Sequence, residues 1–189
     1  MPEQPLVAVL AAGRGSRFGG GKLDVTLAGK PLGRWVLDAV KAAGLEPGVI
    51  VVGPDVPHFA TAAAGWQLVT NPDPEAGQAG SVALAAAAAA GRALLVALAD
   101  MPLVDPDHLR RLAASGGNAA TRYPDGRLGV PACVAAEHVG KLEVLTGDRG
   151  AGPILSGLPD LAVIEADPDT LFDVDTPKQL AQVAERLSR

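Results

Sequence analysis

Short apolar runs alternate with helical patterns between residues 6 and 114, and this alternation constrains the fold more than any other feature. Four runs have the length and composition of buried strands, at residues 6–10, 49–52, 67–69 and 93–98. Helical patterns occupy residues 31–43, 57–64, 81–90 and 106–114. Pro31 suits the first turn of one helix, and Ser81 the N-cap of another. Strands that alternate with helices predict parallel βαβ units with right-handed crossovers.

The second half of the sequence is less regular. Residues 119–122 and 129–134 are predicted strands on either side of a Pro-Asp-Gly turn, and residues 161–164 are a further strand. Thr176 and Pro177 then begin a last helix that extends to about Leu187. No stretch has the composition of a linker, so we expect residues 1–189 to form one three-layer α/β/α domain with a mostly parallel, Rossmann-like sheet.

Composition narrows the class of protein. Aromatic residues make up only 3% of the 189 residues, so Ala, Val and Leu must build the core. The net charge of −5 argues against a generic nucleic-acid binder. Cys133 is the single cysteine, which excludes a disulfide framework and favours an inert, partly buried thiol over a catalytic one. No segment approaches the length of a membrane span, so we expect a cytoplasmic protein. The three histidines lack zinc-site spacing and are expected at the surface: His58, His108 and His138.

The first apolar run opens into a long glycine-rich loop. Six glycines lie between Gly13 and Gly29, and the same loop carries Arg14, Arg17 and Lys22. Glycines let backbone N–H groups approach phosphate oxygens, and the cations neutralise the charge of an anion. A long insert of this kind is usually functional, so an anion site is favoured over a mobile surface turn.

Two known kinds of phosphate loop do not fit this segment. A Walker A loop requires a glycine where Ser16 stands, and Ser or Thr directly after its lysine, where Leu23 stands. A dinucleotide-binding fingerprint requires a third glycine where Phe18 stands, and a helix that opens at once. The loop is therefore expected to wrap its ligand, without presenting a helix N-terminus to it.

The loop sequence A-A-G-R-G-S-R-F-G-G-G-K, at residues 11–22, resembles the signature of sugar-nucleotide pyrophosphorylase-type nucleotidyltransferases. It is most similar to the MobA/MocA-like branch, which attaches nucleotides to molybdopterin. The resemblance implies the nucleotide-diphospho-sugar transferase type of fold and a loop that holds the triphosphate. It assigns nucleotide contacts in this loop to Leu10, Ala12, Gly13, Arg14, Gly15 and Lys22. Lys22 and Arg17, which contact the phosphates, are also catalytic candidates.

Asp100 follows the run at residues 93–98, at the edge where open α/β sheets bind ligands. Asp105 already serves as N-cap of the next helix, so Asp100 has no evident structural role, although it could simply order the loop. L-A-D-M-P-L-V, at residues 98–104, resembles the metal motif of the MobA/MocA-like family. The resemblance implies that Asp100 is catalytic and binds the Mg²⁺ that bridges the nucleotide phosphates.

Asp173 and Asp175 alternate along the extended segment F-D-V-D-T-P, so both can point the same way. In the alternative interpretation Asp175 or Thr176 caps the last helix and Asp173 is solvated. Family members carry a D-x-D-T-P or N-x-N-T-P segment beside the metal. The resemblance therefore implies three carboxylate ligands for Mg²⁺, from Asp100, Asp173 and Asp175.

The segment N-P-D-P-E-A-G-Q-A-G-S-V, at residues 71–82, resembles the family segment that edges the nucleobase, with Asn71, Gly80 and Ser81 as contacts. By itself it also fits an ordinary loop that caps a helix. The first motif has the form L-A-A-G, with Ala12 at its third position, and resembles the cytidylyltransferase branch of the family. Guanylyltransferases of the family more often carry a second glycine at the position of Ala12. This favours CTP over GTP.

L-T-G-D-R-G-A, at residues 145–151, resembles a cytidylyltransferase segment that faces the pterin acceptor. Asp148 and Arg149 are the acceptor candidates, although they could equally form a loop salt bridge. One departure is Val130 before Pro131, where the family often has a polar residue.

The expected activity is transfer of a nucleoside monophosphate from a nucleoside triphosphate, with CTP favoured, to the phosphate of molybdopterin. A molybdenum enzyme or its chaperone is the implied protein partner. The alternatives are the same chemistry with GTP or on a sugar phosphate, methylerythritol phosphate or phospholactate, and a non-catalytic nucleotide-binding chaperone.

Overall fold

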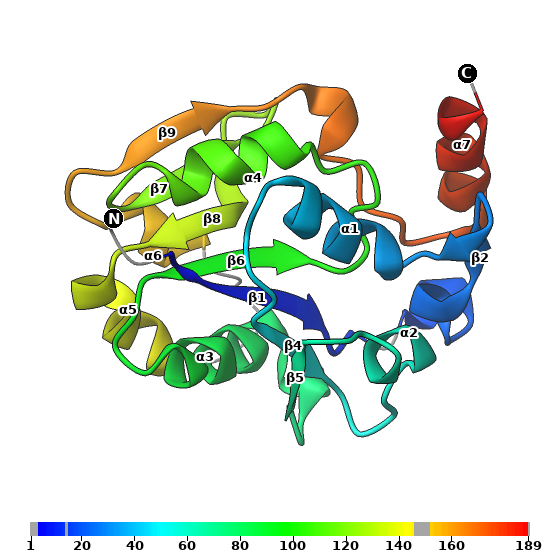
Figure 1. Ribbon diagram of the computed structural model, residues 1–189, viewed down its shortest axis with the longest axis horizontal. Coiled ribbons are helices and arrows are strands. Elements are labelled where there is room, and N and C mark those ends of the chain that lie inside the picture. Colours follow the sequence, from blue (N-terminus) through cyan, green and yellow to red (C-terminus); the bar gives the residue numbers. More distant parts are fainter. Residues whose placement is uncertain (1–3, 14, 146–151, 189) are drawn as a thin grey trace.

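The computed structural model describes residues 4–13, 15–145 and 152–188, and these form a seven-stranded sheet with helices on both faces (Figure 1). The strand order is β5-β4-β1-β6-β8-β7-β9. The strands are β1 Leu6–Ala11, β4 Val49–Val52, β5 Gln67–Thr70, β6 Leu94–Leu98, β7 Ala119–Arg122, β8 Leu128–Val134 and β9 Ala162–Glu165. Within this sheet the strands pair in parallel except where β8 pairs with β6 and β7, which confirms the mostly parallel sheet.

Two helical layers enclose this sheet, as the alternation of side chains along β1 requires. Val7, Val9 and Ala11 share a core with α1 Arg34–Ala42, α2 His58–Thr61, α4 Pro106–Ala113 and α7 Pro177–Leu187. Ala8 and Leu10 point to the other core, which contains α3 Gln78–Ala89, α5 Ala136–Glu143 and α6 Gly152–Ser156. The three-layer α/β/α architecture is therefore confirmed. No helix among the described residues is long and apolar enough to cross a bilayer.

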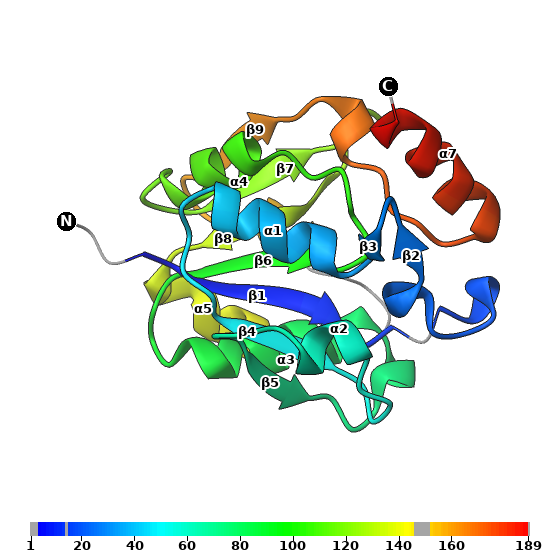
Figure 2. The ribbon, with the colours of Figure 1, turned by 45° about the vertical axis from the view of Figure 1, so that its right-hand side comes forward.

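Short elements gather beyond the arrowheads of β1 and β6, where β2, β3 and α7 lie close together (Figure 2). β2 Thr26–Leu27 and β3 Lys30–Pro31 pair as a small antiparallel hairpin. Four 3₁₀ turns complete the described elements: Ser16–Phe18, Lys22–Asp24, Pro74–Ala76 and Pro168–Thr170. The carboxyl end of the sheet is thus the end to which the glycine-rich loop and the C-terminal segment both return.

Two helix starts differ from the sequence-based prediction. The first helix begins at Arg34, because Pro31 is held in the β3 strand of the hairpin. The third begins at Gln78, with Gly77 at the N-cap position at φ 106°, a conformation that favours glycine. Ser81 therefore lies inside the helix, and its hydroxyl accepts a hydrogen bond from the Asn71 side chain at 3.0 Å. The other predicted elements lie within a few residues of their expected bounds, while α5 and α6 were not predicted.

His108 is buried, so the expectation of a surface position is wrong for this histidine. Its Nε2 lies 2.7 Å from the hydroxyl of Thr121, which itself donates to the carbonyl of Pro131 at 2.6 Å. Arg111 Nη2 lies 3.3 Å from the other ring nitrogen. Because the Thr121 proton is used, His108 Nε2 must donate and Nδ1 must accept, which describes a neutral imidazole. His58 is exposed and His138 is half-buried.

Acidification is expected to destabilise the fold through His108. Burial, followed by the nearby charge of Arg111, lowers its pKa below the ordinary 6.5. The unfolded chain then binds the proton first, so the free energy of unfolding should fall as the pH drops below about 6.5. Urea unfolding at pH 7.5 and pH 5.5 should show a smaller loss in His108→Gln than in the wild type. His58→Gln is the matched control, and an equal loss in all three proteins would contradict the assignment.

Cys133 is buried, and burial raises the pKa of its thiol to about 12. A thiol with this pKa is almost wholly protonated at neutral pH, and a protonated thiol is a poor nucleophile. Its burial agrees with the sequence-based expectation of an inert thiol.

Candidate active site

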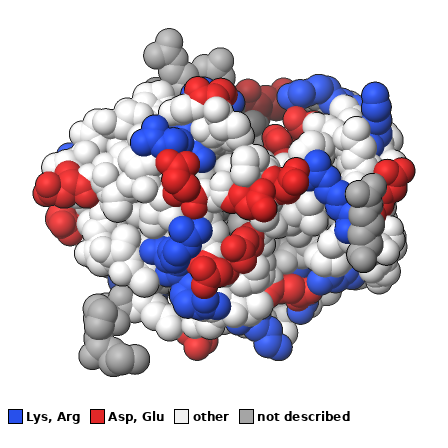
Figure 3. All heavy atoms as spheres, turned by 90° about the horizontal axis from the view of Figure 1, so that it is seen from above, with Lys and Arg blue, Asp and Glu red and all other residues white. Residues whose placement is uncertain are grey.

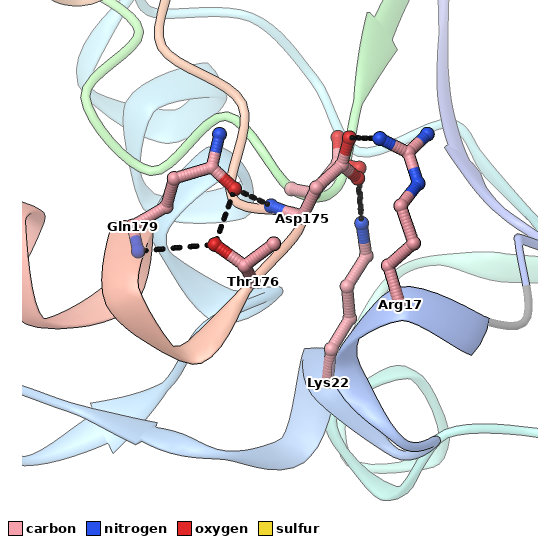
Figure 4. A network of polar contacts seen from close by, with 6 residues as sticks. Arg17, Lys22, Asp175, Thr176 and Gln179 are labelled. Atoms are coloured by element: carbon pink, nitrogen blue, oxygen red, sulfur yellow. Dashed lines mark hydrogen bonds and ion pairs between the residues drawn. The ribbon is translucent and has the colours of Figure 1, made fainter.

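Lys22 lies at the centre of the site, in the 3₁₀ turn that ends the glycine-rich loop. Its side chain is only 7% exposed. The ammonium donates to Asp100 Oδ2 at 2.7 Å and to Asp175 Oδ1 at 3.0 Å (Figure 4 shows the second contact). A lysine from the first loop is thus joined to carboxylates 78 and 153 residues further along the chain.

The backbone around Lys22 fixes the direction of its side chain. Gly15 has a φ of +59°, and a Cβ atom there would lie 3.1 Å from both Cγ and Cδ of Lys22. Asp24 anchors the other side of the turn, because its carboxylate accepts from the backbone amides of His58 and Phe59, both at 2.7 Å. Sequence analysis missed Asp24, since its partners lie on a helix more than 30 residues away.

The electrostatics favour a charged lysine. Burial alone would lower the pKa of Lys22, but the carboxylates of Asp100 and Asp175 outweigh it, and the pKa lies above its ordinary value. Burial raises the pKa of Asp100; Lys22 opposes this rise, and the nearby charge of Asp173 adds to it. Asp100 therefore lies between a cation that stabilises its charge and a second carboxylate that disfavours it.

Backbone hydrogen bonds bring Asp100 and the C-terminal segment together. Asp100 follows β6, and its carbonyl accepts from the amide of Val174 at 2.9 Å. Val174 is buried, while the residues on either side of it, Asp173 and Asp175, point away from the core. Both side chains therefore lie on the face opposite Val174, but only Asp175 contacts Lys22, whereas Asp173 lines a different cavity.

Thr176, and not Asp175, caps the last helix (Figure 4). The Thr176 hydroxyl accepts from the amide of Gln179 at 3.3 Å and donates to its side-chain oxygen at 2.9 Å. That same oxygen accepts from the amide of Asp175 at 2.9 Å. The Asp175 carboxylate is consequently free of capping and reaches Lys22. The alternative interpretation is therefore correct for Thr176, which caps the helix, and for Asp173, which is exposed.

Arg17 adds a second cation to this cluster. Its side chain is 77% exposed, and its Nη1 lies 3.3 Å from Asp175 Oδ2 (Figure 4). An exposed guanidinium of this kind can leave the carboxylate for an anion at little cost, since exposed ion pairs are weak. Arg14 lies outside the described residues.

The expected three-carboxylate metal site is not assembled in this structure. Among the described residues, no group of three His, Cys, Asp or Glu side chains is placed to hold a metal ion. Asp100 and Asp175 converge on the Lys22 ammonium, whereas Asp173 lines a separate cavity. The Lys22 ammonium occupies the position between Asp100 and Asp175, two of the three predicted metal ligands. The set of metal ligands therefore stays a prediction.

Two cavities adjoin the glycine-rich loop. One of about 810 Å³ is lined by Ala12, Gly13 and Lys22 together with Gly53 and Pro74. A smaller one of about 160 Å³ shares Ala12 and Gly13 with the first. The smaller cavity is also lined by Leu10, Gln78, Ser81, Leu98 and Asp100. The structure therefore places three of the six predicted loop contacts, Leu10, Ala12 and Gly13, in the cavity beside Asp100.

Of the predicted nucleobase contacts, Ser81 lines the cavity of about 160 Å³, whereas Asn71 and Gly80 do not. Asn71 is buried, and its side chain joins the Ser81 hydroxyl to the backbone amide of Asp73, both at 3.0 Å. Asn71 thus braces the loop against α3, while Ser81 lines the smaller cavity. Gly80 faces the Asn71 side chain, which would lie 3.5 Å from an added Cβ.

The acceptor candidates Asp148 and Arg149 lie outside the described residues. A cavity of about 900 Å³ is nevertheless present among the described residues, and Asp173 and Val130 are part of its wall. The Val130 carbonyl accepts from the hydroxyl of Tyr123 at 2.5 Å. Tyr123 and Gln78 also line this cavity, and sequence analysis singled out neither, because no motif marks them.

The molecular surface carries no continuous basic stripe on the face seen from above, where acidic and basic side chains are interspersed (Figure 3). Ion pairs account for part of this pattern, as in Arg110 with Asp107 and Arg122 with Glu165. The arrangement agrees with the net charge of −5 and with a local anion site.

A family model described as the MobA-like NTP transferase domain matches residues 7–163, which include Lys22, Asp100 and both cavities' loop residues. The chain belongs to this family. The matched part of the chain is therefore an NTP transferase domain of the MobA-like type.

Solved structures share the fold over almost the whole chain. Rv0371c from Mycobacterium tuberculosis H37Rv is 28% identical, with a TM-score of 0.82 over 98% of this chain and 99% of that one. A structure of Rv0371c with manganese is 26% identical, with a TM-score of 0.78 over 98% and 100%. Molybdopterin-guanine dinucleotide biosynthesis protein A from Archaeoglobus fulgidus is 23% identical, with a TM-score of 0.67 over 96% and 98%.

A curated relative is the bifunctional protein GlmU of Sorangium cellulosum, 35% identical over 120 residues. The match covers 57% of this chain and 25% of GlmU, so the chain spans about a quarter of the length of the curated relatives that it matches.

Proposed function

We propose that this protein transfers a nucleoside monophosphate from a nucleoside triphosphate, CTP in the first place, to the phosphate of a molybdopterin-type acceptor. The observation that carries the proposal is the buried Lys22 ammonium held between Asp100 and Asp175 at the end of the glycine-rich loop. If the ion pairs of Lys22 were only structural, they would not require a glycine-rich loop, whose backbone N–H groups are suited to phosphate binding. We expect the protein in the cytoplasm, with residues 1–189 acting as one domain.

The reaction joins two anions and needs no strong base. An oxygen of the acceptor phosphate attacks the α-phosphorus of the nucleotide, and the bond from that phosphorus to the bridging oxygen breaks. Pyrophosphate leaves with the electron pair. The acceptor phosphate is already ionised, so positioning and charge stabilisation supply the catalysis. Lys22 and Arg17 move from their carboxylates toward the triphosphate and neutralise its charge.

We infer that Asp100, Asp173 and Asp175 would hold a hard divalent cation, because Mg²⁺ prefers carboxylate oxygens. Asp100 and Asp175 already converge on one cation, the Lys22 ammonium, whereas Asp173 would have to turn toward them from the neighbouring cavity. Bound Mg²⁺ would orient the phosphates and offset their charge. A manganese complex of the mycobacterial relative agrees with a divalent cation.

CTP is expected to bind more tightly than GTP. Ala12 lines both cavities beside the loop, and its methyl group would leave less room for a purine than a glycine would. Thermal unfolding with CTP, GTP, ATP or UTP and Mg²⁺ should show the largest shift with CTP, since a ligand at 100 times its Kd stabilises by roughly 2.7 kcal/mol. Ala12→Gly should narrow the difference between CTP and GTP. Equal stabilisation of the wild type by CTP and GTP would contradict the CTP assignment.

Two alternative functions would give different results when nucleotide binding and pyrophosphate release are measured. A transferase acting on a sugar phosphate, methylerythritol phosphate or phospholactate would release pyrophosphate with that acceptor and not with molybdopterin. A nucleotide-binding chaperone for a molybdenum enzyme would bind the nucleotide and release no pyrophosphate with any acceptor. Lys22 and the adjoining carboxylates favour catalysis over the chaperone role.

A further inference from the structure

Asp24 follows Lys22 in the same 3₁₀ turn, and each oxygen of its carboxylate accepts a hydrogen bond from a backbone amide. Oδ2 accepts from the amide of His58 and Oδ1 from the amide of Phe59, both at 2.7 Å. These are the first two amides of α2, and amides in the first turn of a helix have no partner within that helix. The turn that carries Lys22 is therefore fastened to the start of α2.

The same contacts join two segments that line the cavity of about 810 Å³. One segment is residues 20–24, which include Lys22, and the other is residues 53–57, which lead directly into α2. Asp24 itself lies in this wall. A free carboxylate there would repel a triphosphate, but the two amide hydrogens directed at Asp24 offset its charge. Asp24 can thus hold the two sides of an anion site together.

Other contacts hold the backbone of the turn without Asp24. Leu23 is buried in the same core as Phe59, and its carbonyl accepts from the amide of Gly33 at 2.9 Å. These contacts lie on the hairpin side of the turn and do not involve the Asp24 carboxylate. Loss of that carboxylate should therefore loosen the position of Lys22 and leave the core intact.

We propose that Asp24 is a positioning residue: through the first two amides of α2 it sets the place of the Lys22 turn, and through Lys22 it sets the charge that faces the triphosphate. The catalytic part of this inference rests on the proposed nucleotidyl transfer. Asp24 acts on the reaction only through Lys22, since both of its own oxygens are occupied by backbone donors.

Acetylation of the free protein reports the position of the Lys22 ammonium without any nucleotide. Acetic anhydride reacts with amines that leave their ion pairs, and peptide masses give the rate at each lysine. In Asp24→Asn, Lys22 should react about tenfold faster than in the wild type, because asparagine presents an NH₂ donor to one of the two amides. The rate at Lys30, which pairs with Asp38, should be unchanged. An unchanged rate at Lys22, or an equal rise at both lysines, would overturn the inference.

His58 provides a matched pair of variants for the same contact. Proline at this position removes the amide hydrogen that Asp24 accepts, and proline is well tolerated at the first position of a helix. Alanine removes the exposed imidazole and keeps the amide. His58→Pro should therefore raise the acetylation rate of Lys22 about tenfold, and His58→Ala should leave it within about twofold of the wild type. Equal rates in these two variants would show that the amide contact does not hold Lys22.

A double-mutant cycle measures the effect on turnover. Asp24→Asn should lower turnover about tenfold when Lys22 is present, and less than about twofold in the Lys22→Met background, where the ammonium that it positions is absent. An equal loss in both backgrounds would mean that Asp24 acts independently of Lys22, which contradicts the inference.

The two kinds of measurement separate this inference from the proposed function. If the wild type released no pyrophosphate with any acceptor, the proposed function would fail, and the acetylation rates would still decide whether Asp24 positions Lys22. If pyrophosphate appeared but Asp24→Asn left both turnover and Lys22 acetylation unchanged, the positioning role would fail and nucleotidyl transfer would stand.

Discussion

Replacement of Lys22 by methionine should lower turnover about 10²- to 10³-fold, the usual effect of removing one preorganised charge contact to a reacting group. Methionine is close to lysine in length and fills the space beside Gly15, so the loss should report the ammonium and not a collapsed loop. The activity should be compared below the melting temperature of the variant, because Asp100 and Asp175 lose the cation that they share.

The same variant should gain affinity for a divalent cation in the absence of nucleotide. In the free protein the Lys22 ammonium occupies the position between Asp100 and Asp175, and a metal ion must compete with it. Titration with Mn²⁺, followed by electron paramagnetic resonance, should therefore show tighter binding to Lys22→Met than to the wild type. Lys41→Met, at an exposed position on α1, is the matched control. Weaker Mn²⁺ binding in Lys22→Met would show that the lysine supports the metal site and does not compete for it.

Asp100→Asn should have an effect of similar size, with at least about a 10²-fold loss of turnover. A neutral amide is a poorer ligand for a hard cation, so the Mg²⁺ concentration needed for half-maximal activity should also rise. The fold should persist, because Asp105 caps α4 through the amide of Asp107 at 3.0 Å.

Asp105→Asn is the matched control for this substitution, since asparagine is as good an N-cap as aspartate. Its activity and Mg²⁺ dependence should equal those of the wild type. Full activity of Asp100→Asn at limiting Mg²⁺ would place the metal away from Asp100.

Much of the fold followed from the sequence because the strands are continuous apolar runs and the helices have local start signals. The position of Asp100 after such a run predicted its place at the carboxyl edge. The two wrong helix starts have a different origin. Pro31 and Ser81 both have suitable local chemistry, but the partners that decide their roles are Thr26 in the hairpin and Asn71 in the preceding loop.

The contacts that define the site could not be predicted from local patterns. Asp175 and Thr176 were equivalent capping candidates until Gln179 was seen to bind the Thr176 hydroxyl. That Lys22 would lie between two aspartates in the free protein depends on the packing of the chain's two ends. The cavity of about 900 Å³ beside Asp173 is lined by Gln78 of α3, Tyr123 after β7 and Ser156 of α6. No sequence spacing connects these three residues.

The most direct test of nucleotidyl transfer is to incubate the full chain with CTP, Mg²⁺ and molybdopterin and to measure pyrophosphate together with the mass of the product. Pyrophosphate should appear in equal amount to a pterin carrying one added cytidine monophosphate, and both products should depend on Lys22. Binding of CTP and Mg²⁺ without pyrophosphate release, with molybdopterin and with every other phosphorylated acceptor supplied, would contradict nucleotidyl transfer.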